Sequence, residues 1–172
     1  MISIDNLTIR AMNQNDFPLM AKWLSHPEVL KFYEESPYNL EQVFLKYGPR
    51  VEGKHYVKPC IVEYKLLPIG YIQYYPVQDS ELKAYAMREN GVIFGIDQFI
   101  GEPEMWGKGI GTSMVSLMLK YLSQVNEEVK VVLDVKKNNI RAIACYKKCG
   151  FRIVKVLEDE KWLMEWKKST VS

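Results

Sequence analysis

The sequence lacks a long run of apolar residues, and its N-terminus lacks a basic stretch followed by an apolar one. A helix that crosses a bilayer needs about 20 consecutive apolar residues, and a secretory signal needs both of those N-terminal stretches. We therefore expect neither a membrane-spanning segment nor a leader, no membrane as a partner, and a cytoplasmic location.

Cysteine is scarce as well, with Cys60, Cys145 and Cys149 making up the whole complement. An odd number of thiols without metal-like clustering argues against a disulfide framework and against a metal centre. Cys145 and Cys149 lie four positions apart, a spacing that suits two metal ligands on one helix, but no second pair of ligands follows. We predict reduced, structural thiols and no bound metal.

An excess of charge of one sign is also missing. The formal net charge is +2 over 172 residues, with a pI near 8.3, which is too small to indicate nucleic acid as the partner. Hydrophobic residues make up 48% and charged residues 26%, as in globular proteins, so disordered and fibrous classes are excluded. The length fits one domain over residues 1–172, present as a monomer or a homodimer.

The apolar pattern has helical spacing early in the chain and mostly strand-like runs later. We predict strands over 7–12, 58–64, 69–75, 91–99, 130–135, 151–157 and 161–166, helices over about 15–24, 28–33, 39–47, 109–124 and 138–150, and a polar loop over 78–90. Helices that return across a mostly antiparallel sheet make an α+β, or mixed α/β, fold.

One segment with chemical meaning is Trp106-Gly-Lys-Gly-Ile-Gly-Thr112, between a predicted strand and a predicted helix. Its alternating glycines let the backbone approach a ligand closely, and free amides at a helix start attract an anion such as a pyrophosphate. Lys108 adds a positive charge and Thr112 a hydroxyl donor. The segment matches neither the dinucleotide fingerprint nor the P-loop, and a tight corner without a ligand is the alternative interpretation.

A second segment, Asn138-Asn-Ile-Arg-Ala-Ile-Ala-Cys-Tyr-Lys-Lys-Cys-Gly-Phe151, follows the strand over 130–135. It is locally basic in a nearly neutral chain. Tyr146 lies one turn before the predicted helix end, where its phenol can donate a proton to a departing thiolate. A tyrosine that only packs in the core is the alternative for this position.

The two segments together resemble the acetyl-CoA signatures of the GNAT acetyltransferase superfamily. Within it, Ile96-Asp-Gln-Phe-Ile-Gly-Glu-Pro103 joined to the glycine turn is similar to aminoglycoside 6′-N-acetyltransferases, as are Pro68-Ile-Gly-Tyr-Ile-Gln73 and Lys22-Trp-Leu24. The resemblance implies a GNAT-like central sheet flanked by helices and acetyl-CoA as the cosubstrate. It also implies acetyl transfer to an amine of an aminoglycoside antibiotic, and hence antibiotic resistance.

The resemblance also implies roles for individual residues. Acetyl-CoA would contact Gln98, Phe99, Ile100, Lys108, Gly109, Ile110, Gly111, Thr112, Asn139, Ala142 and Tyr146, and the aminoglycoside would contact Phe32, Tyr33, Tyr47, Gln73, Asp97 and Asp134. Asp97 and Tyr146 would be catalytic. Trp106 departs from the superfamily, which usually has Arg or Gln there, so the backbone amides and Lys108 must carry more of the anion binding.

Charge chemistry supports a cationic acceptor at Asp97 and Asp134, which end neighbouring predicted strands, so their carboxylates could face one cleft. An ordinary Asp has a pKa of ~3.9 and an amine one of roughly 8 to 10, so direct deprotonation is uphill by about 5 to 8 kcal/mol. We therefore expect Asp97 to anchor and orient the ammonium and to pass its proton on, directly or through a linked water. Neighbouring carboxylates would raise the pKa of Asp97 and so reduce its difference from the pKa of the amine.

Two other functions remain open at this stage. The first keeps the fold and changes the acceptor to a protein N-terminus, a polyamine or a siderophore precursor. The second is a non-catalytic domain that binds acetyl-CoA as a sensor. An acyl-cysteine mechanism is disfavoured because His26 and His55 lie in segments without catalytic context.

Overall fold

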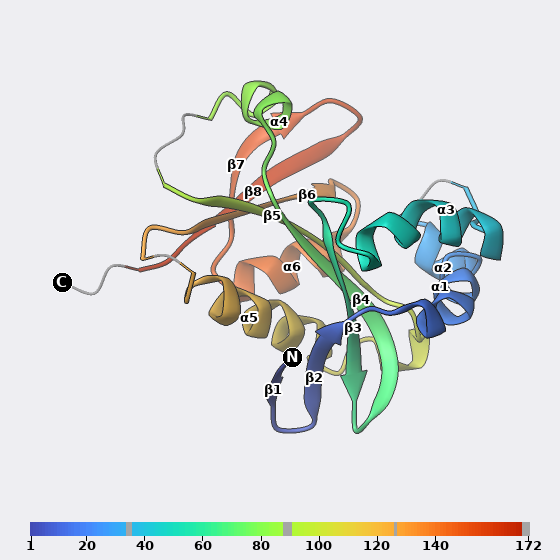
Figure 1. Cartoon of the computed structure of the whole chain (residues 1–172). Helices are drawn as coiled ribbons and strands as arrows, with labels where there is room; N and C mark the ends of the chain where they lie inside the picture. Colours follow the sequence, from blue (N-terminus) through green and yellow to red (C-terminus); the bar gives the residue numbers. More distant parts are fainter. Residues whose placement is uncertain (34–35, 88–90, 126, 170–172) are drawn as a thin grey trace. The chain divides into compact units, whose positions relative to one another are not determined.

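The computed structural model describes residues 1–33, 36–87, 91–125 and 127–169 (Figure 1). Its strands belong to one eight-stranded sheet in the order β1-β2-β3-β4-β5-β6-β8-β7, flanked by helices. This confirms the predicted mixed α/β class. The chain forms two compact units, unit 1 with Met1–Gln73 and Gln98–Met114, and unit 2 with Tyr74–Asp97 and Val115–Ser172. The single domain over 1–172 stays a prediction.

Unit 1 begins with two β-hairpins. β1 (Ile2–Ile4) pairs antiparallel with β2 (Leu7–Ala11), which pairs antiparallel with β3 (Lys58–Tyr64). β4 (Leu67–Pro76) follows a two-residue turn in which Lys65 and Leu66 have φ of 50° and 68°. Positive φ at both positions matches the right-handed twist of the strands, so the loop expected over 65–68 is tighter than predicted.

The helices of unit 1 come between its two hairpins. η1 (Gln14–Asp16) leads into α1 (Phe17–Trp23), followed by α2 (Pro27–Leu30) and α3 (Leu40–Val51). Asn13 and Asn39 each form a capping box, which satisfies orphan amides at the start of η1 and α3. Figure 1 shows α1 and α3 beside each other, and their buried side chains join those of β3 and β4 in one core: Met12, Phe17, Met20, Trp23, Leu24, Val43, Tyr47, Ile61 and Tyr71.

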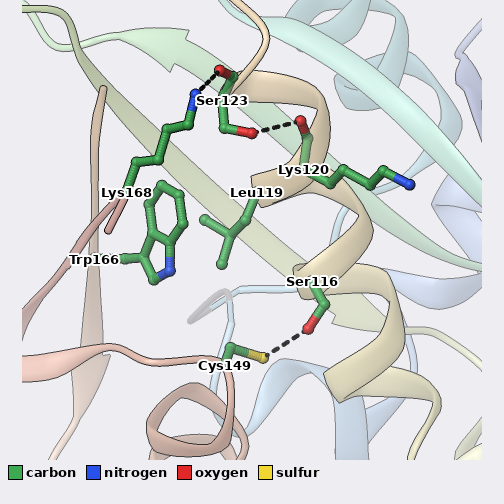
Figure 2. Close-up of a pocket in the computed structure, with 7 residues that line it drawn as sticks. All are labelled: Ser116, Leu119, Lys120, Ser123, Cys149, Trp166 and Lys168. Carbon is green, nitrogen blue, oxygen red and sulfur yellow. Dashed lines mark hydrogen bonds between the residues drawn. The ribbon is translucent and has the colours of Figure 1, made fainter. Parts of the chain in front are cut away.

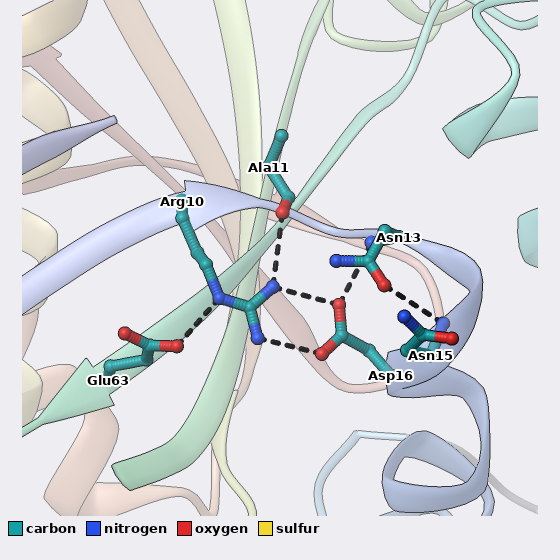
Figure 3. Close-up of polar contacts among 6 residues, drawn as sticks. All are labelled: Arg10, Ala11, Asn13, Asn15, Asp16 and Glu63. Carbon is teal, nitrogen blue, oxygen red and sulfur yellow. Dashed lines mark hydrogen bonds and ion pairs between the residues drawn. The ribbon is translucent and has the colours of Figure 1, made fainter. Parts of the chain in front are cut away.

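An ion-pair network ties β2 to β3 and to η1 (Figure 3). Arg10 donates to Asp16 through Nη1 and Nη2 at 2.9 and 2.7 Å, and through Nε to Glu63 at 2.7 Å. The Asp16 side chain is 8% exposed, and its Oδ2 also accepts from the Asn13 amide at 2.9 Å. These two carboxylates, first of all the hydrogen bond to Asp16, raise the pKa of Arg10 despite its partial burial.

Four paired strands, β6, β8, β7 and most of β5, form the sheet in unit 2. β5 (Ile93–Ile100) runs parallel to β6 (Lys130–Lys136), which pairs antiparallel with β8 (Lys161–Lys167). β7 (Arg152–Leu157) pairs antiparallel with β8, with a register shift between Ile153 and Lys155. α4 (Asp79–Ala84), α5 (Ile110–Leu122) and α6 (Ile140–Lys148) complete the helices of the chain, and η2 (Pro103–Met105) lies in unit 1.

Three predicted element bounds need correction. The polar loop expected over 78–90 contains α4, a helix too short to show a helical period. The helix expected to end at Tyr47 continues to Val51, with Pro49 inside it, and the Lys54 amide donates to the Pro49 carbonyl just after the helix ends. The helix expected over 28–33 ends at Leu30.

Among the described residues, no helix is long and apolar enough to cross a membrane.

Candidate active site

The glycine turn of unit 1 has the backbone geometry that close approach of a ligand requires. Gly107 and Gly109 have φ of 72° and 77°, and a side chain added at either would meet no atom within 4 Å. α5 begins at Ile110, so its first amides have no acceptor within the helix. Open space in front of free amides fits an anionic group such as the pyrophosphate of acetyl-CoA.

The side chains of the glycine turn are arranged around this backbone. Lys108 is exposed, Gly111 and Thr112 are half-buried, and the Ile110 side chain is buried, so Ile110 can offer only its amide to a ligand. The Trp106 indole N–H donates to the Ile100 carbonyl at 3.0 Å. Trp106 stands where the superfamily usually has an Arg or Gln that can donate to the cofactor. Here its indole connects the turn to the end of β5 instead.

Glu102 connects two segments that carry the family resemblance, because it lies in the segment that ends at Pro103 and contacts the Lys22-Trp-Leu24 segment. Trp23 Nε1 and Lys22 Nζ donate to Glu102 Oε1 at 2.9 and 3.1 Å. Burial alone would raise the pKa of Glu102, but these two hydrogen bonds and the Lys22 charge lower it overall. A side chain at Gly101 would lie 2.3 Å from the Trp23 indole, so this glycine is required by the close approach of Trp23.

Phe99 links the end of β5 to the aromatic side chains of unit 1. Its ring lies 4.6 Å from Tyr33, 5.5 Å from Tyr71 and 6.0 Å from Trp23. The predicted cofactor residue Phe99 and the predicted acceptor residue Tyr33 are therefore neighbours. Phe32 has the Lys31 ammonium 5.2 Å from its ring centroid.

Tyr47 and Gln73 are more buried than expected for residues predicted to contact the acceptor. Tyr47 is 0% exposed and packs against Tyr71 at 5.6 Å, and Gln73 is 8% exposed. Gln73 Oε1 accepts from the Tyr71 hydroxyl at 2.6 Å and from Arg50 Nη1 at 2.9 Å. Arg50 was not a predicted site residue; its position three residues after Tyr47 on a helix is the signal that could have found it.

Asp97 and Asp134 lie at the same level of unit 2. The parallel pairing of β5 and β6 matches Gly95 with Val132, and each aspartate lies two residues further along its strand. Residues at one level of parallel strands point to the same face, so the two side chains share a face of the sheet, and their binding of one acceptor stays a prediction. They lie inside their strands rather than at the ends, because both strands continue for some residues beyond them. Asp134 also pairs with Lys161 at 3.4 Å.

Three further residues of unit 2 interact electrostatically with these carboxylates, and the sequence patterns predicted none of them. Burial, then Asp97 and Glu81, raise the pKa of Tyr75. Burial, then Asp134 and Glu81, raise the pKa of Tyr85 to about 12. Glu81, Tyr75 and Tyr85 are therefore part of the electrostatic surroundings of the two aspartates. Glu81 and Tyr85 come from α4 and its C-cap, where the sequence predicts a loop.

α6 carries the remaining predicted cofactor residues. Asn139 is the N-cap, and its Oδ1 accepts from the Ala142 amide at 3.2 Å, so these two groups are used to start the helix. Tyr146 is 8% exposed, with its ring 6.0 Å from Phe151. Gly150 has φ of 97°, which confirms it as the glycine that ends the helix. The role of Tyr146 as a proton donor stays a prediction.

Two of the three thiols, those of Cys60 and Cys149, are poor nucleophiles. A shallow hollow of about 330 Å³ in unit 2 is lined by Cys149, Ser116, Leu119, Lys120, Ser123, Trp166 and Lys168 (Figure 2). A hydrogen bond with Cys145, and then burial, raise the pKa of Cys149, while burial raises that of Cys60 to about 11. Since the thiolate is the nucleophile, neither cysteine suits an acyl-enzyme mechanism near neutral pH.

A family model described as an acetyltransferase (GNAT) domain matches residues 13–158, which include the glycine turn, both aspartates and α6. The chain belongs to the GNAT acetyltransferase family. It is an acetyl-CoA-dependent N-acetyltransferase, and acetyl-CoA is its cosubstrate. The open amides of the glycine turn are the part of the structure that fits this cosubstrate.

Relatives within the family include proteins named for aminoglycosides and for polyamines. The chain is 32% identical over 151 residues to an aminoglycoside N(6′)-acetyltransferase type 1 of Klebsiella pneumoniae, covering 87% of this chain and 75% of that one. It is 29% identical over 100 residues to a spermine/spermidine N(1)-acetyltransferase of Bacillus subtilis, covering 57% and 61%.

The chain is also similar to a solved structure of an aminoglycoside acetyltransferase. The aminoglycoside acetyltransferase AAC(6′)-Ib in complex with paromomycin and acetyl-CoA superposes with a TM-score of 0.80, at 27% identity, covering 98% of this chain and 99% of that one. The predicted GNAT-like fold is thereby confirmed.

Proposed function

We propose that the protein is an aminoglycoside 6′-N-acetyltransferase that confers antibiotic resistance. The observation that carries the proposal is the group of carboxylates in unit 2. Asp97 and Asp134 share one level of the sheet, and Glu81 acts with both on Tyr75. Several carboxylates that act on the same tyrosine suit an acceptor with several ammonium groups. The likeness to aminoglycoside acetyltransferases supports this choice.

Acetyl transfer in this proposal proceeds by direct attack. The neutral amine nitrogen forms a bond to the thioester carbonyl carbon, the carbon–sulfur bond breaks, and the sulfur leaves as a thiolate that takes up a proton from Tyr146. The nitrogen loses its second proton as the amide forms, and that proton restores the Tyr146 phenol, so acetyl transfer to the ammonium releases one proton overall. The proton lost by the ammonium leaves through Asp97 or a water bound to it. Positioning and stabilisation of the oxyanion by a backbone amide near Phe99 or Ile100 supply the rate enhancement.

The roles that the sequence predicts for other residues also belong to the proposal. The amides from Gly109 to Thr112 and the Lys108 ammonium bind the pyrophosphate, and Gln98 lies along the thioester. Phe32 and Tyr33 provide flat surfaces for sugar rings. The protein works in the cytoplasm, as a monomer or a homodimer, with no nucleic acid or membrane as partner.

The deciding experiment is a thiol-release assay with acetyl-CoA and a panel of amines. We expect CoA release with aminoglycosides that carry a 6′-amine and none with an analogue that lacks it. Release that does not depend on the 6′-amine would exclude the 6′ assignment. Faster turnover of spermine or spermidine than of any aminoglycoside would favour a polyamine acetyltransferase, the alternative that the Bacillus subtilis relative supports.

Replacing Asp97 with Asn tests the role of the carboxylate. Asn keeps the shape but cannot hold an ammonium or pass on its proton, so we expect kcat to fall by about 10² to 10³ while the KM for acetyl-CoA changes little. Steady-state kinetics with both substrates measures this. The matched control is Asp159→Asn in the exposed turn before β8, which should behave as the unchanged protein; near-normal kcat in Asp97→Asn rules the role out.

A further inference from the structure

Arg50 is a half-buried cation of unit 1 for which the described residues provide no carboxylate partner. It lies in the last turn of α3. Its Nη1 donates to Gln73 Oε1 at 2.9 Å, its Cζ lies 5.4 Å from the Tyr47 ring centroid, and its buried Nε has no hydrogen-bond partner. A guanidinium offers five N–H donors, so the protein itself uses few of them.

The hydrogen bonds at Gln73 fix which way its amide points. Two donors, the Tyr71 hydroxyl and Arg50 Nη1, converge on one atom at 2.6 and 2.9 Å. An atom that accepts two such bonds must be the carbonyl oxygen. Gln73 and Tyr47 are 8% and 0% exposed, whereas Arg50 reaches the surface. Arg50 is therefore the member of this network that a bound molecule meets first.

A second positive charge lies on the same helix. Lys46 Nζ is 5.4 Å from the Tyr47 ring centroid and 4.9 Å from that of Tyr38. Gln73 and Tyr47, which the sequence predicts to contact the acceptor, both lie against these cations, so an acceptor bound at them would meet positive charge.

We propose that Arg50 is a specificity-determining residue that binds a hydroxyl or carboxylate oxygen of the acceptor and disfavours an ammonium at that position. Guanidinium N–H groups donate to oxygens and repel cations. This inference rests on the proposed function and names which acceptors it prefers. The enzyme selects aminoglycosides whose ammonium groups are concentrated away from the part that meets Arg50.

The test uses pairs of aminoglycosides with the same skeleton and the same 6′-amine that differ by one hydroxyl-to-amine exchange, such as kanamycin A and kanamycin B. In the pair in which the exchanged hydroxyl or amine contacts Arg50, we expect a higher kcat/KM for the aminoglycoside that carries the hydroxyl than for the one that carries the amine. Arg50→Gln should reduce that preference by roughly fivefold or more, because it removes the charge. The change should appear in the KM for the acceptor and not in kcat or in the KM for acetyl-CoA.

Two control variants separate charge from structure. Arg50→Lys keeps the charge and should keep the preference. Lys54→Gln removes the same charge from a side chain that is 73% exposed and four residues further along, and should leave every ratio within about twofold. Thermal unfolding of each variant shows that it is folded.

The possible outcomes distinguish this inference from the proposed function. If no aminoglycoside is acetylated, the proposed function is wrong and the inference is wrong with it. If aminoglycosides are acetylated but no pair changes its ratio in Arg50→Gln, or Lys54→Gln changes it equally, only the role of Arg50 is overturned.

Discussion

At the scale of single residues, the Glu81 carboxylate destabilises the fold but can bind an ammonium group of the acceptor. Its Oε2 is buried without a hydrogen-bond partner. Burial raises its pKa, and the neighbouring Asp134 raises it further, against a hydrogen bond from the Gln78 backbone that lowers it. A carboxylate in such a place destabilises the fold until a cation arrives. An ammonium of the acceptor would relieve both the burial and the repulsion.

Replacing Glu81 with Gln tests this balance. Because the pKa of Glu81 is raised in the folded protein, the fold favours the protonated form, and its stability falls as pH rises through the raised pKa. Gln mimics the protonated form at every pH. We therefore expect Glu81→Gln to raise Tm at neutral pH and to have little effect near pH 4, as measured by thermal unfolding at both pH values.

The same variant should bind the acceptor less well. We expect a KM for a polycationic acceptor several-fold higher, with an unchanged KM for acetyl-CoA. Glu158→Gln, in the exposed turn before β8, serves as the control and should show neither effect. Equal stability of Glu81→Gln at neutral and acidic pH would contradict the assignment of a destabilising carboxylate.

At the scale of elements, the glycine turn before α5 depends on backbone conformation rather than on side chains. Gly109→Ala forces a φ of 77° on a residue with a Cβ and places a methyl group in the open space before the helix amides. We expect a loss of about 1 kcal/mol in stability and a rise of at least tenfold in the KM for acetyl-CoA. Denaturant unfolding and steady-state kinetics measure the two effects.

Gly53 provides a matched control for this turn. Its φ is 74°, and an added side chain there also meets no atom within 4 Å, so Gly53→Ala imposes the same strain far along the chain from the turn. It should lose the same stability and keep the KM for acetyl-CoA. If both variants raise that KM alike, the effect comes from lost stability and not from blocked amides.

At the scale of the whole molecule, net stability is only about 5 to 15 kcal/mol, so one buried ion pair can be decisive. Asp16→Asn leaves the Arg10 guanidinium without the carboxylate that accepts from both Nη1 and Nη2, on a side chain that is 8% exposed. We expect a loss of about 2 to 4 kcal/mol in the free energy of unfolding and a fall in Tm of roughly 5 to 15 °C. Calorimetry or denaturant unfolding measures it.

An exposed ion pair gives the comparison. Lys54 and Glu52 are 2.7 Å apart but 73% and 44% exposed, so Glu52→Gln should leave the free energy of unfolding nearly unchanged, because water screens the pair. A similar loss in both variants would show that the Arg10 network contributes no more than a surface pair.

Much of the fold could be predicted because local patterns carry it. The strand over 58–64 was placed correctly, and the helices that became α5 and α6 were placed within two residues at each end. β1 was missed because its alternation covers only Ile2–Ile4. α4 was missed because one buried side chain, Leu82, does not make a helical period.

The sequence by itself determined the cofactor chemistry and the family. Three glycines before a helix and the segment from Asn138 to Phe151 are continuous in the chain, and neighbours in sequence stay neighbours in space. Only the tertiary structure decided the surroundings of the predicted acceptor residues. Glu81 approaches Asp134, and Arg50 approaches Gln73, through sheet and helix packing between residues far apart in the chain, which no local pattern of residues records.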